Sequence, residues 1–265
     1  RGRAPQVGEH FVLQGAAATL KRIAASGGRD FYEGETAHKL VAHAQAHDAA
    51  LTLADLRDYA PQWVAPISQA YRGHTLHQIP PNGQGIAALI ALGILQNFDV
   101  AARPVDHPAT QHLLIEAMKL AFADVYAHVA DAQHMQVTPE QMLAADYLAQ
   151  RARLIDPNAA QAHASGHAPR GGTVYLTAAD KCGMMVSFIQ SNYMGFGSGV
   201  VVPGTGVSLQ NRGHCFSTDP GHPNAVAGGK RPFHTIIPAF LMRNGAPVMS
   251  FGVMGGNMQP QGQVQ

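Results

Sequence analysis

The chain changes character at Gly171-Gly172-Thr173-Val174-Tyr175. Before this stretch, residues 156–170 are polar and small and show no apolar periodicity, which is typical of a loop or linker. After it, segments 173–177 and 184–189 alternate on either side of a polar turn and predict a β-hairpin. A threonine hydroxyl is a poor nucleophile without a base, and its own α-amino group becomes a base once the preceding bond is cut. Thr173 is therefore either an ordinary strand start or a nucleophile released by cleavage.

The composition is that of a globular protein. Of 265 residues, 46% are hydrophobic and 13% are charged, which excludes a disordered chain and is ample for a buried core. A net charge of +1 argues against nucleic-acid or membrane-surface partners, and no apolar run is long enough for a membrane helix. Cys182 and Cys215 are too few for a disulfide framework.

The first half of the chain is predicted to be mostly helical, and the second half is rich in strands and glycine. Apolar periodicity predicts helices over 13–25, 36–46, 85–97 and 109–129. The last two are predicted to be amphipathic, and alternation predicts one strand over 71–78. Thr52 and Thr138 each precede an acid or amide by three residues, which predicts capped helix starts. Asn244-Gly245 predicts a hairpin turn.

Short motifs on both sides of Thr173 carry a family resemblance. Those downstream are Ser191-Asn192-Tyr193-Met194-Gly195-Phe196-Gly197-Ser198-Gly199, Leu209-Gln210-Asn211-Arg212, Gly229-Lys230-Arg231-Pro232 and Gly252-Val253-Met254-Gly255-Gly256. Those upstream include Phe31-Tyr32-Glu33-Gly34, Leu53-Ala54-Asp55-Leu56-Arg57-Asp58-Tyr59, Ile94-Leu95-Gln96-Asn97-Phe98-Asp99 and Ala121-Phe122-Ala123-Asp124. As a set, over nearly the whole chain, they resemble the γ-glutamyltransferase family of N-terminal-nucleophile hydrolases.

This resemblance implies an α+β fold, the four-layer αββα sandwich of the N-terminal-nucleophile hydrolases. The chain is expected to be an internal fragment of it, because it lacks an initiator methionine and a closing element. The implied domains are a helical large-subunit portion over 1–172, ending in a processing linker, and a β-rich catalytic small-subunit portion over 173–265. The compartment is left open between the cytoplasm, which we favour, and the periplasm or exterior.

The resemblance also implies the catalytic residues. The precursor would cut itself between Gly172 and Thr173, and the new amine would act as general base toward the Thr173 hydroxyl. Ser191 falls where the family places a hydroxyl that hydrogen-bonds the nucleophile and assists processing. Gly255 and Gly256 would supply backbone amides to the oxyanion of the tetrahedral intermediate.

The implied substrate-binding residues depart from the family pattern. His234 and Thr235 stand where the transferases carry a serine pair that holds the substrate carboxylate, so a titratable group replaces one hydroxyl. Tyr193 replaces an asparagine, and Asn211 and Arg212 stand where an Asn-Gln pair is expected.

The acidic residue that follows this pair and holds the substrate's α-amino group is replaced by Cys215. A cationic amine favours a carboxylate partner, so the acyl-transfer machinery is expected to be intact while a γ-glutamyl specificity is poorly supported. The implied activity is an amidohydrolase or acyltransferase that cleaves γ-glutamyl or related amides through an acyl-enzyme. It would act on a small-molecule amide, with no cofactor or metal.

Two alternatives remain open. One is an amidase for small acid amides such as oxamate, without γ-glutamyl activity. The other is an inactive homologue that serves as a binding or structural subunit. The expected partners are large and small subunits cut from one precursor, and assembly of that heterodimer into a homo-oligomer is left open.

Three other patterns favour ordinary structure. Gly83-Gln84-Gly85 has the placement of a dinucleotide-binding turn but lacks a following βαβ unit, so we expect a structural turn. His43 and His47 have zinc-ligand spacing without a third ligand, which favours a solvated helix face. Cys215 beside His214 could form a catalytic pair, but a small buried residue is the preferred interpretation.

Overall fold

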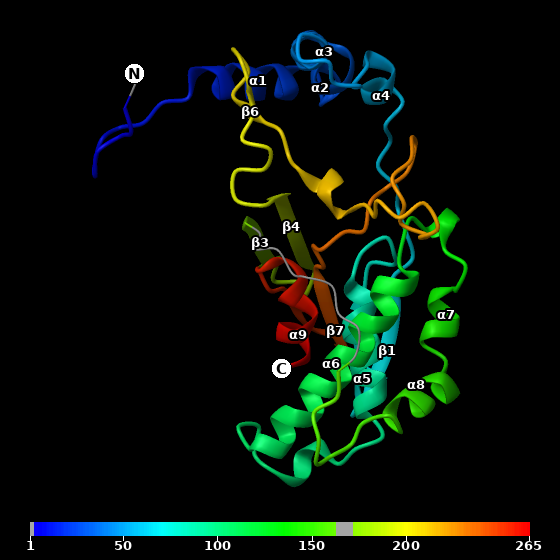
Figure 1. Ribbon diagram of the computed structural model, residues 1–265. Helices are drawn as coiled ribbons and strands as arrows, with labels where there is room; N and C mark the ends of the chain where they lie inside the picture. The colour runs from blue at the N-terminus through cyan, green and yellow to red at the C-terminus, as the bar shows by residue number, and fades with distance from the viewer. Residues whose placement is uncertain (1–2, 163–171) are drawn as a thin grey trace. The chain divides into compact units, whose positions relative to one another are not determined.

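The computed structural model describes residues 3–162 and 172–265 and divides into two compact units (Figure 1). One unit comprises Arg1–Trp63 with Phe196–Leu209, and the other comprises Val64–Gly195 with Gln210–Gln265. Most of the expected processing linker, residues 163–171, lies outside the described residues. Within the described ranges, no helix is both long and apolar enough to span a membrane.

The first unit is built from short helices and one small strand pair. The helices are α1 (Gln14–Ala25), α2 (Arg29–Glu33), α3 (Glu35–Gln45) and α4 (Leu53–Arg57), and the strands are β5 (Val201–Val202) and β6 (Val207–Ser208). The helices predicted over 13–25 and 36–46 are confirmed. The capped start is also confirmed, because the Thr52 and Asp55 side chains cap each other's backbone amides.

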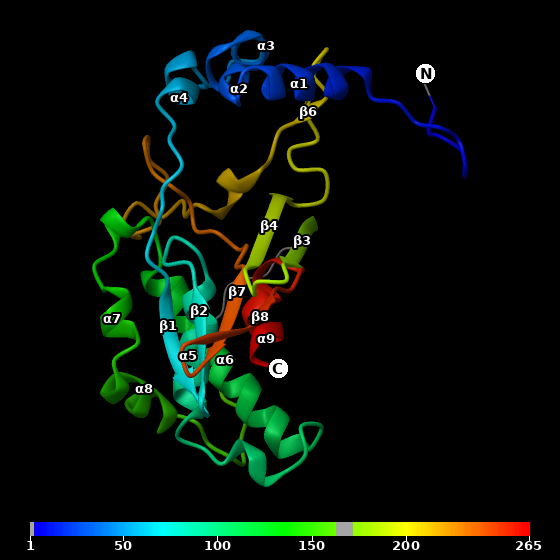
Figure 2. The same ribbon diagram turned by 180° about the vertical axis from the view of Figure 1, so that it is seen from behind.

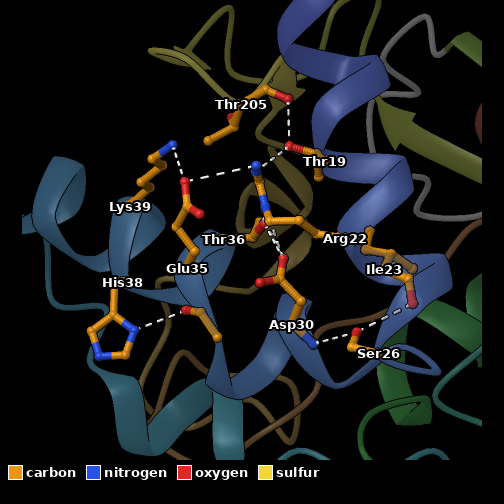
Figure 3. Close-up of polar contacts among 11 residues, drawn as sticks. Thr19, Arg22, Ile23, Ser26, Asp30, Glu35, Thr36, His38, Lys39 and Thr205 are labelled. Carbon is orange, nitrogen blue, oxygen red and sulfur yellow. Dashed lines mark hydrogen bonds and ion pairs between the residues drawn. The ribbon is translucent and has the colours of Figure 1, made fainter.

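A partly buried polar network joins the helices of this unit (Figure 3). Arg22 on α1 lies 3.4 Å from the Asp30 carboxylate, which also accepts a short hydrogen bond from the Thr36 hydroxyl. The Thr19 hydroxyl donates to the Thr205 carbonyl at 2.9 Å and thereby ties α1 to the segment between β5 and β6. Polar side chains therefore link α1 to α2, to α3 and to the β5–β6 segment.

The second unit contains an antiparallel sheet in the order β1-β2-β7-β8. Its strands are β1 (Ile67–Tyr71), β2 (His74–Gln78), β7 (Ala239–Arg243) and β8 (Ala246–Phe251). A separate hairpin is formed by β3 (Gly172–Ala179) and β4 (Met185–Tyr193), as the sequence predicted. The hairpin predicted at Asn244-Gly245 is confirmed between β7 and β8.

The helices of this unit form its core with the sheet (Figure 2). They are α5 (Gly85–Leu95), α6 (Pro108–His128), α7 (Pro139–Met142), α8 (Ala145–Ala152) and α9 (Gln259–Val264). Short 3-10 turns lie at η1 (Val100–Ala102), η2 (Ala132–His134), η3 (Arg212–Cys215) and η4 (Gly256–Met258). The capping box predicted at Thr138 starts α7.

Two predictions about this unit were wrong. The strand predicted over 71–78 begins only at His74, because Arg72 and Gly73 take positive φ angles of 47° and 81° and form the turn between β1 and β2. The helix α5 was predicted to be amphipathic, but every one of its residues is buried. It contacts β1 and β2 on one side and α6, α8 and α9 on others, so it has no solvent face.

The β3–β4 hairpin is attached to the end of β8. The Ser187 hydroxyl donates to the Phe251 carbonyl at 3.3 Å, and Thr177 shares a short hydrogen bond with Ser250. At Gly252, an added Cβ would lie 2.5 Å from the Tyr175 ring, so only glycine fits this approach. The segment that follows β8 therefore runs beside the strand that carries Thr173.

Candidate active site

Thr173 lies at a β-bulge near the start of β3. Gly172 pairs with Tyr193, and the register then shifts before the next pair, so Thr173 opposes more than one residue of β4. The half-buried Thr173 hydroxyl donates to the Ser191 hydroxyl at 3.2 Å. The pair predicted as nucleophile and assisting hydroxyl is thus in direct contact.

An open hollow of about 430 Å³ is lined in part by Thr173. Its lining residues are Thr173, Val174, Gln190, Ser191, Asn192 and Gly195. A small molecule could therefore approach the threonine from this side, along a wall with amide and hydroxyl side chains.

Tyr193 links Ser191 to the predicted substrate-binding residues. Its φ of 79° is unusual for a bulky residue, and its backbone N–H donates to the Ser191 hydroxyl at 2.8 Å. Its side chain is buried, and its hydroxyl hydrogen-bonds the Cys215 thiol. Burial and this hydrogen bond raise the pKa of Tyr193, and the ring centroid lies 5.0 Å from the Arg212 guanidinium.

Asn211 shapes the turn that follows Tyr193. Its side-chain oxygen accepts from the Met194 backbone N–H at 3.1 Å, and its own N–H donates to the Asn192 carbonyl at 3.2 Å. This amide is therefore used within the protein, and its role in substrate binding stays a prediction.

Arg212 and Cys215 lie in η3, where Arg212 is buried and Cys215 is half-buried. Nη1 of Arg212 donates to the Thr235 hydroxyl at 3.0 Å, so two of the predicted substrate-binding residues are in contact. Burial lowers the pKa of the guanidinium and raises the pKa of the Cys215 thiol, which keeps the thiol protonated at neutral pH.

His234 is held beside the turn that precedes α5. Its backbone N–H donates to the Asn82 carbonyl at 3.0 Å, and its carbonyl accepts from the Gln84 N–H at 2.9 Å. Burial, with the Arg212 charge as a second cause, lowers the pKa of His234 to about 3. The titratable group expected from the sequence is therefore a neutral imidazole at neutral pH.

Gln84 is a site residue that the sequence reasoning missed. Its fully buried amide donates to the Thr235 carbonyl at 2.7 Å and to the Gly256 carbonyl at 2.9 Å. One side chain thus ties the predicted substrate-binding segment to the predicted oxyanion segment. Its only signal was a polar residue directly before an apolar helix, in a stretch that was interpreted as a structural turn.

Gly255 and Gly256 have φ angles of 148° and 66°, which favour glycine. An added Cβ at Gly255 would also lie 2.8 Å from the Met258 sulfur. In the described part of the chain, neither glycine makes a hydrogen bond to Thr173, and their role as oxyanion donors stays a prediction.

The histidine pair on α3 and the two cysteines were interpreted from the sequence as ordinary structural residues. The His43 and His47 rings lie 4.3 Å apart on α3. Among the described residues, no three potential metal ligands come together. Cys182 is exposed, Cys215 is half-buried, and both are free thiols.

The whole chain, residues 1–265, matches the family model described as gamma-glutamyltranspeptidase. The chain belongs to the gamma-glutamyltranspeptidase family. This confirms the resemblance predicted from the motifs.

Relatives within the gamma-glutamyltranspeptidase family have differing names. The glutathione hydrolase-like YwrD proenzyme of Bacillus subtilis is 40% identical over 99% of this chain and 50% of its own length. The oxamate amidohydrolase proenzyme of Klebsiella pneumoniae is 40% identical over 99% of this chain and 49% of its own length. This chain therefore spans about half the length of these relatives.

A solved structure of cephalosporin acylase from Bacillus halodurans is similar to this chain with a TM-score of 0.94 and 52% identity. The likeness covers 100% of this chain and 48% of the acylase. The predicted fold class is confirmed: the chain is a mixed α and β fragment of the N-terminal-nucleophile hydrolase fold.

Proposed function

We propose that the protein is a self-processing amidohydrolase of the gamma-glutamyltranspeptidase family, with Thr173 as its nucleophile. The observation that carries this proposal is the 3.2 Å hydrogen bond between the Thr173 and Ser191 hydroxyls beside an open hollow. The family's proenzyme relatives support a precursor that is cut into two subunits.

Self-processing would use the same hydroxyl as catalysis. The Thr173 oxygen attacks the Gly172 carbonyl and displaces the Thr173 nitrogen, which takes up a proton and becomes a free α-amine. Water then hydrolyses the resulting ester, so that residues up to Gly172 end in a carboxylate. Ser191, which accepts from Thr173 in the uncut chain, orients the attacking hydroxyl. The subunit boundary at 172/173 is part of this proposal.

Turnover would follow the acyl-enzyme route. The Thr173 amine removes the hydroxyl proton, and the oxygen attacks the substrate amide to give a tetrahedral oxyanion. Backbone N–H groups of Gly255 and Gly256 would stabilise that oxyanion, and the leaving amine departs with a proton. Water, or an acceptor amine, then releases the acyl group.

The acyl group would be held by Tyr193, Asn211, Arg212, His234 and Thr235. The contacts among Tyr193, Arg212 and Thr235 support a shared pocket wall. The named activities of relatives suggest γ-glutamyl amides and oxamate as the first substrates to test.

Turnover by the intact protein tests this proposal. We expect hydrolysis of at least one amide from a panel of γ-glutamyl-4-nitroanilide, glutathione and oxamate, lost in Thr173→Ala and partly retained in Thr173→Ser. If wild-type protein and Thr173→Ala are equally silent on the whole panel, the binding or structural subunit becomes the better account.

A further inference from the structure

Gln84 has a fully buried amide whose two N–H bonds are both used. Its residue surface is 0% exposed, and Nε2 donates to the Thr235 carbonyl at 2.7 Å and to the Gly256 carbonyl at 2.9 Å. Carbonyl oxygens can only accept, so these two neighbours require the amide nitrogen on their side and Oε1 on the other. One nitrogen atom therefore holds a carbonyl of the predicted substrate-binding segment and a carbonyl of the predicted oxyanion segment.

The main chain that carries this amide is itself fixed against the substrate-binding segment. The backbone N–H of Gln84 donates to the His234 carbonyl at 2.9 Å, and the His234 N–H donates to the Asn82 carbonyl at 3.0 Å. The Asn82 side chain adds a hydrogen bond to the Pro232 carbonyl at 2.6 Å. The Gln84 amide thus extends to Gly256 from a main chain that is held in place.

Gly255 and Gly256 need an external contact to define their conformation. Their φ angles of 148° and 66° lie where glycine is favoured, and glycine has more backbone freedom than any other residue. A hydrogen bond to the Gly256 carbonyl fixes the plane of the peptide group that follows this residue. Asn257 is held as well, because its Nδ2 donates to the Tyr126 hydroxyl at 2.8 Å. The two contacts together limit the directions that the glycine N–H groups can take.

A second buried glutamine holds the next part of the chain and does not contact the glycine pair. Gln78 is 1% exposed, and its Nε2 donates to Oε1 of Gln263 at 2.6 Å. Gln263 lies on α9, and its own Nε2 donates to the Ile237 carbonyl at 2.8 Å. The protein therefore offers two glutamines of equal burial, of which Gln84 reaches the predicted oxyanion segment and Gln78 reaches α9.

We infer that Gln84 is a positioning residue for acyl transfer, which holds the backbone N–H groups of Gly255 and Gly256 in the orientation that the oxyanion requires. This inference rests on the proposed amidase function with Thr173 as nucleophile. Donors stabilise an oxyanion best when they are in place before the charge develops, and a misplacement of about 1 Å can slow a reaction about 100-fold. The oxyanion forms from every acyl group, so loss of the Gln84 amide should lower kcat whatever the substrate.

The variants Gln84→Met and Gln78→Met separate this role from a structural one. Methionine keeps the approximate length of glutamine and removes its amide. Both variants should lower the midpoint of thermal unfolding, because each leaves buried polar groups without a partner. Only Gln84→Met should lower kcat, by about tenfold or more and by a similar factor on every amide that the wild type hydrolyses, with a smaller change in KM. Gln78→Met should keep the wild-type kcat.

Gln84→Glu is a milder variant, because it keeps the shape of the side chain. A carboxyl group buried beside two carbonyl oxygens stays protonated and retains one O–H donor. Its kcat should therefore lie between those of the wild type and Gln84→Met. If Gln84→Met does not fold, this variant carries the test, and a wild-type kcat in folded Gln84→Glu overturns the inference.

Equal kcat values in Gln84→Met and Gln78→Met would make Gln84 a purely structural residue and overturn the inference, while leaving the proposed amidase function intact. A rise in KM alone would also overturn it, because the effect would then act through Thr235. If the wild type hydrolyses no amide, the proposed function fails, and hydrogen exchange of the backbone amides over 253–258 decides the role of Gln84. Faster exchange there in Gln84→Met than in Gln78→Met supports its hold on this segment, and equal exchange overturns it.

Discussion

The Ser191 hydroxyl accepts from the Thr173 hydroxyl at 3.2 Å, at a bulge of the β3–β4 hairpin. The same oxygen accepts from the backbone N–H of Tyr193 at 2.8 Å, and Tyr193 has a positive φ of 79° where the chain turns at the end of β4. The position of the candidate nucleophile therefore depends on the turn that ends β4 as well as on its own strand.

Replacement of Ser191 tests whether this contact matters for chemistry. We expect Ser191→Ala to slow self-cleavage about tenfold, since one hydrogen bond to the nucleophile is lost, and Ser191→Thr to retain it. Ser187→Ala is the matched control on the same strand, because its hydroxyl contacts Phe251 instead. The time course of self-cleavage would be measured by mass spectrometry. Equal rates in Ser191→Ala and Ser187→Ala would exclude a role of Ser191 in cleavage.

Alanine substitutions at Gly255 and Gly245 distinguish an effect of backbone strain from an effect on catalysis. Both have positive φ angles, 148° and 77°, but a Cβ has space at Gly245 and meets Met258 at Gly255. We expect Gly245→Ala to lower the unfolding free energy by about 1–2 kcal/mol and to leave kcat unchanged. Gly255→Ala should in addition lower kcat, because the oxyanion segment moves. A normal kcat in Gly255→Ala would remove this segment from the mechanism.

The depressed pKa of His234 predicts a specific pH dependence of stability. Its folded pKa of about 3 lies below the ordinary value of 6.5, so the unfolded chain binds this proton more readily. The contribution of neutral His234 to the free energy of unfolding is fully present above pH 6.5 and is lost as the pH falls from there toward 3. It amounts to about 2 kcal/mol between pH 7 and pH 5.

His234→Asn should remove that part of the acid sensitivity. Urea unfolding of both proteins at pH 7 and pH 5 would measure it. The same loss of unfolding free energy in wild type and variant would show that His234 is not held neutral by the fold.

The Arg22 network predicts which ion pair supports the first unit. Arg22 is 25% exposed in its side chain and contacts a largely buried Asp30, whereas the Arg29–Glu33 pair has 79% and 45% exposed side chains. We expect Arg22→Met to destabilise this unit by about 1–3 kcal/mol and Arg29→Met by less than about 0.5 kcal/mol. Hydrogen exchange of the backbone amides of α1 and α3 measures the loss of stability in each variant. Equal protection in Arg22→Met and Arg29→Met would contradict the expected difference between the two ion pairs.

Local sequence signals predicted the elements that depend on local chemistry. The capping boxes at Thr52 and Thr138 and the Asn244-Gly245 turn need only neighbouring residues, and all three are present. The order of motifs placed Thr173 and Ser191, and the structure brings their hydroxyls together.

Features set by tertiary contacts could not be read in the same way. The burial of α5 is different, because Gly85–Leu95 contains no polar side chain and a helix that is apolar on all sides is expected to be buried; the prediction of an amphipathic helix overlooked this signal. The Gln84 amide bonds to carbonyls about 150 or more positions away, which no local pattern encodes. The neutral state of His234 likewise follows from burial and from Arg212, not from its neighbours in sequence.

The most direct measurement is the intact mass of the expressed protein, for wild type beside Thr173→Ala. The account predicts two fragments that meet at Gly172/Thr173 in wild type and one uncut chain in the variant. A single uncut chain in both, or cleavage at another bond, would contradict Thr173 as the released nucleophile.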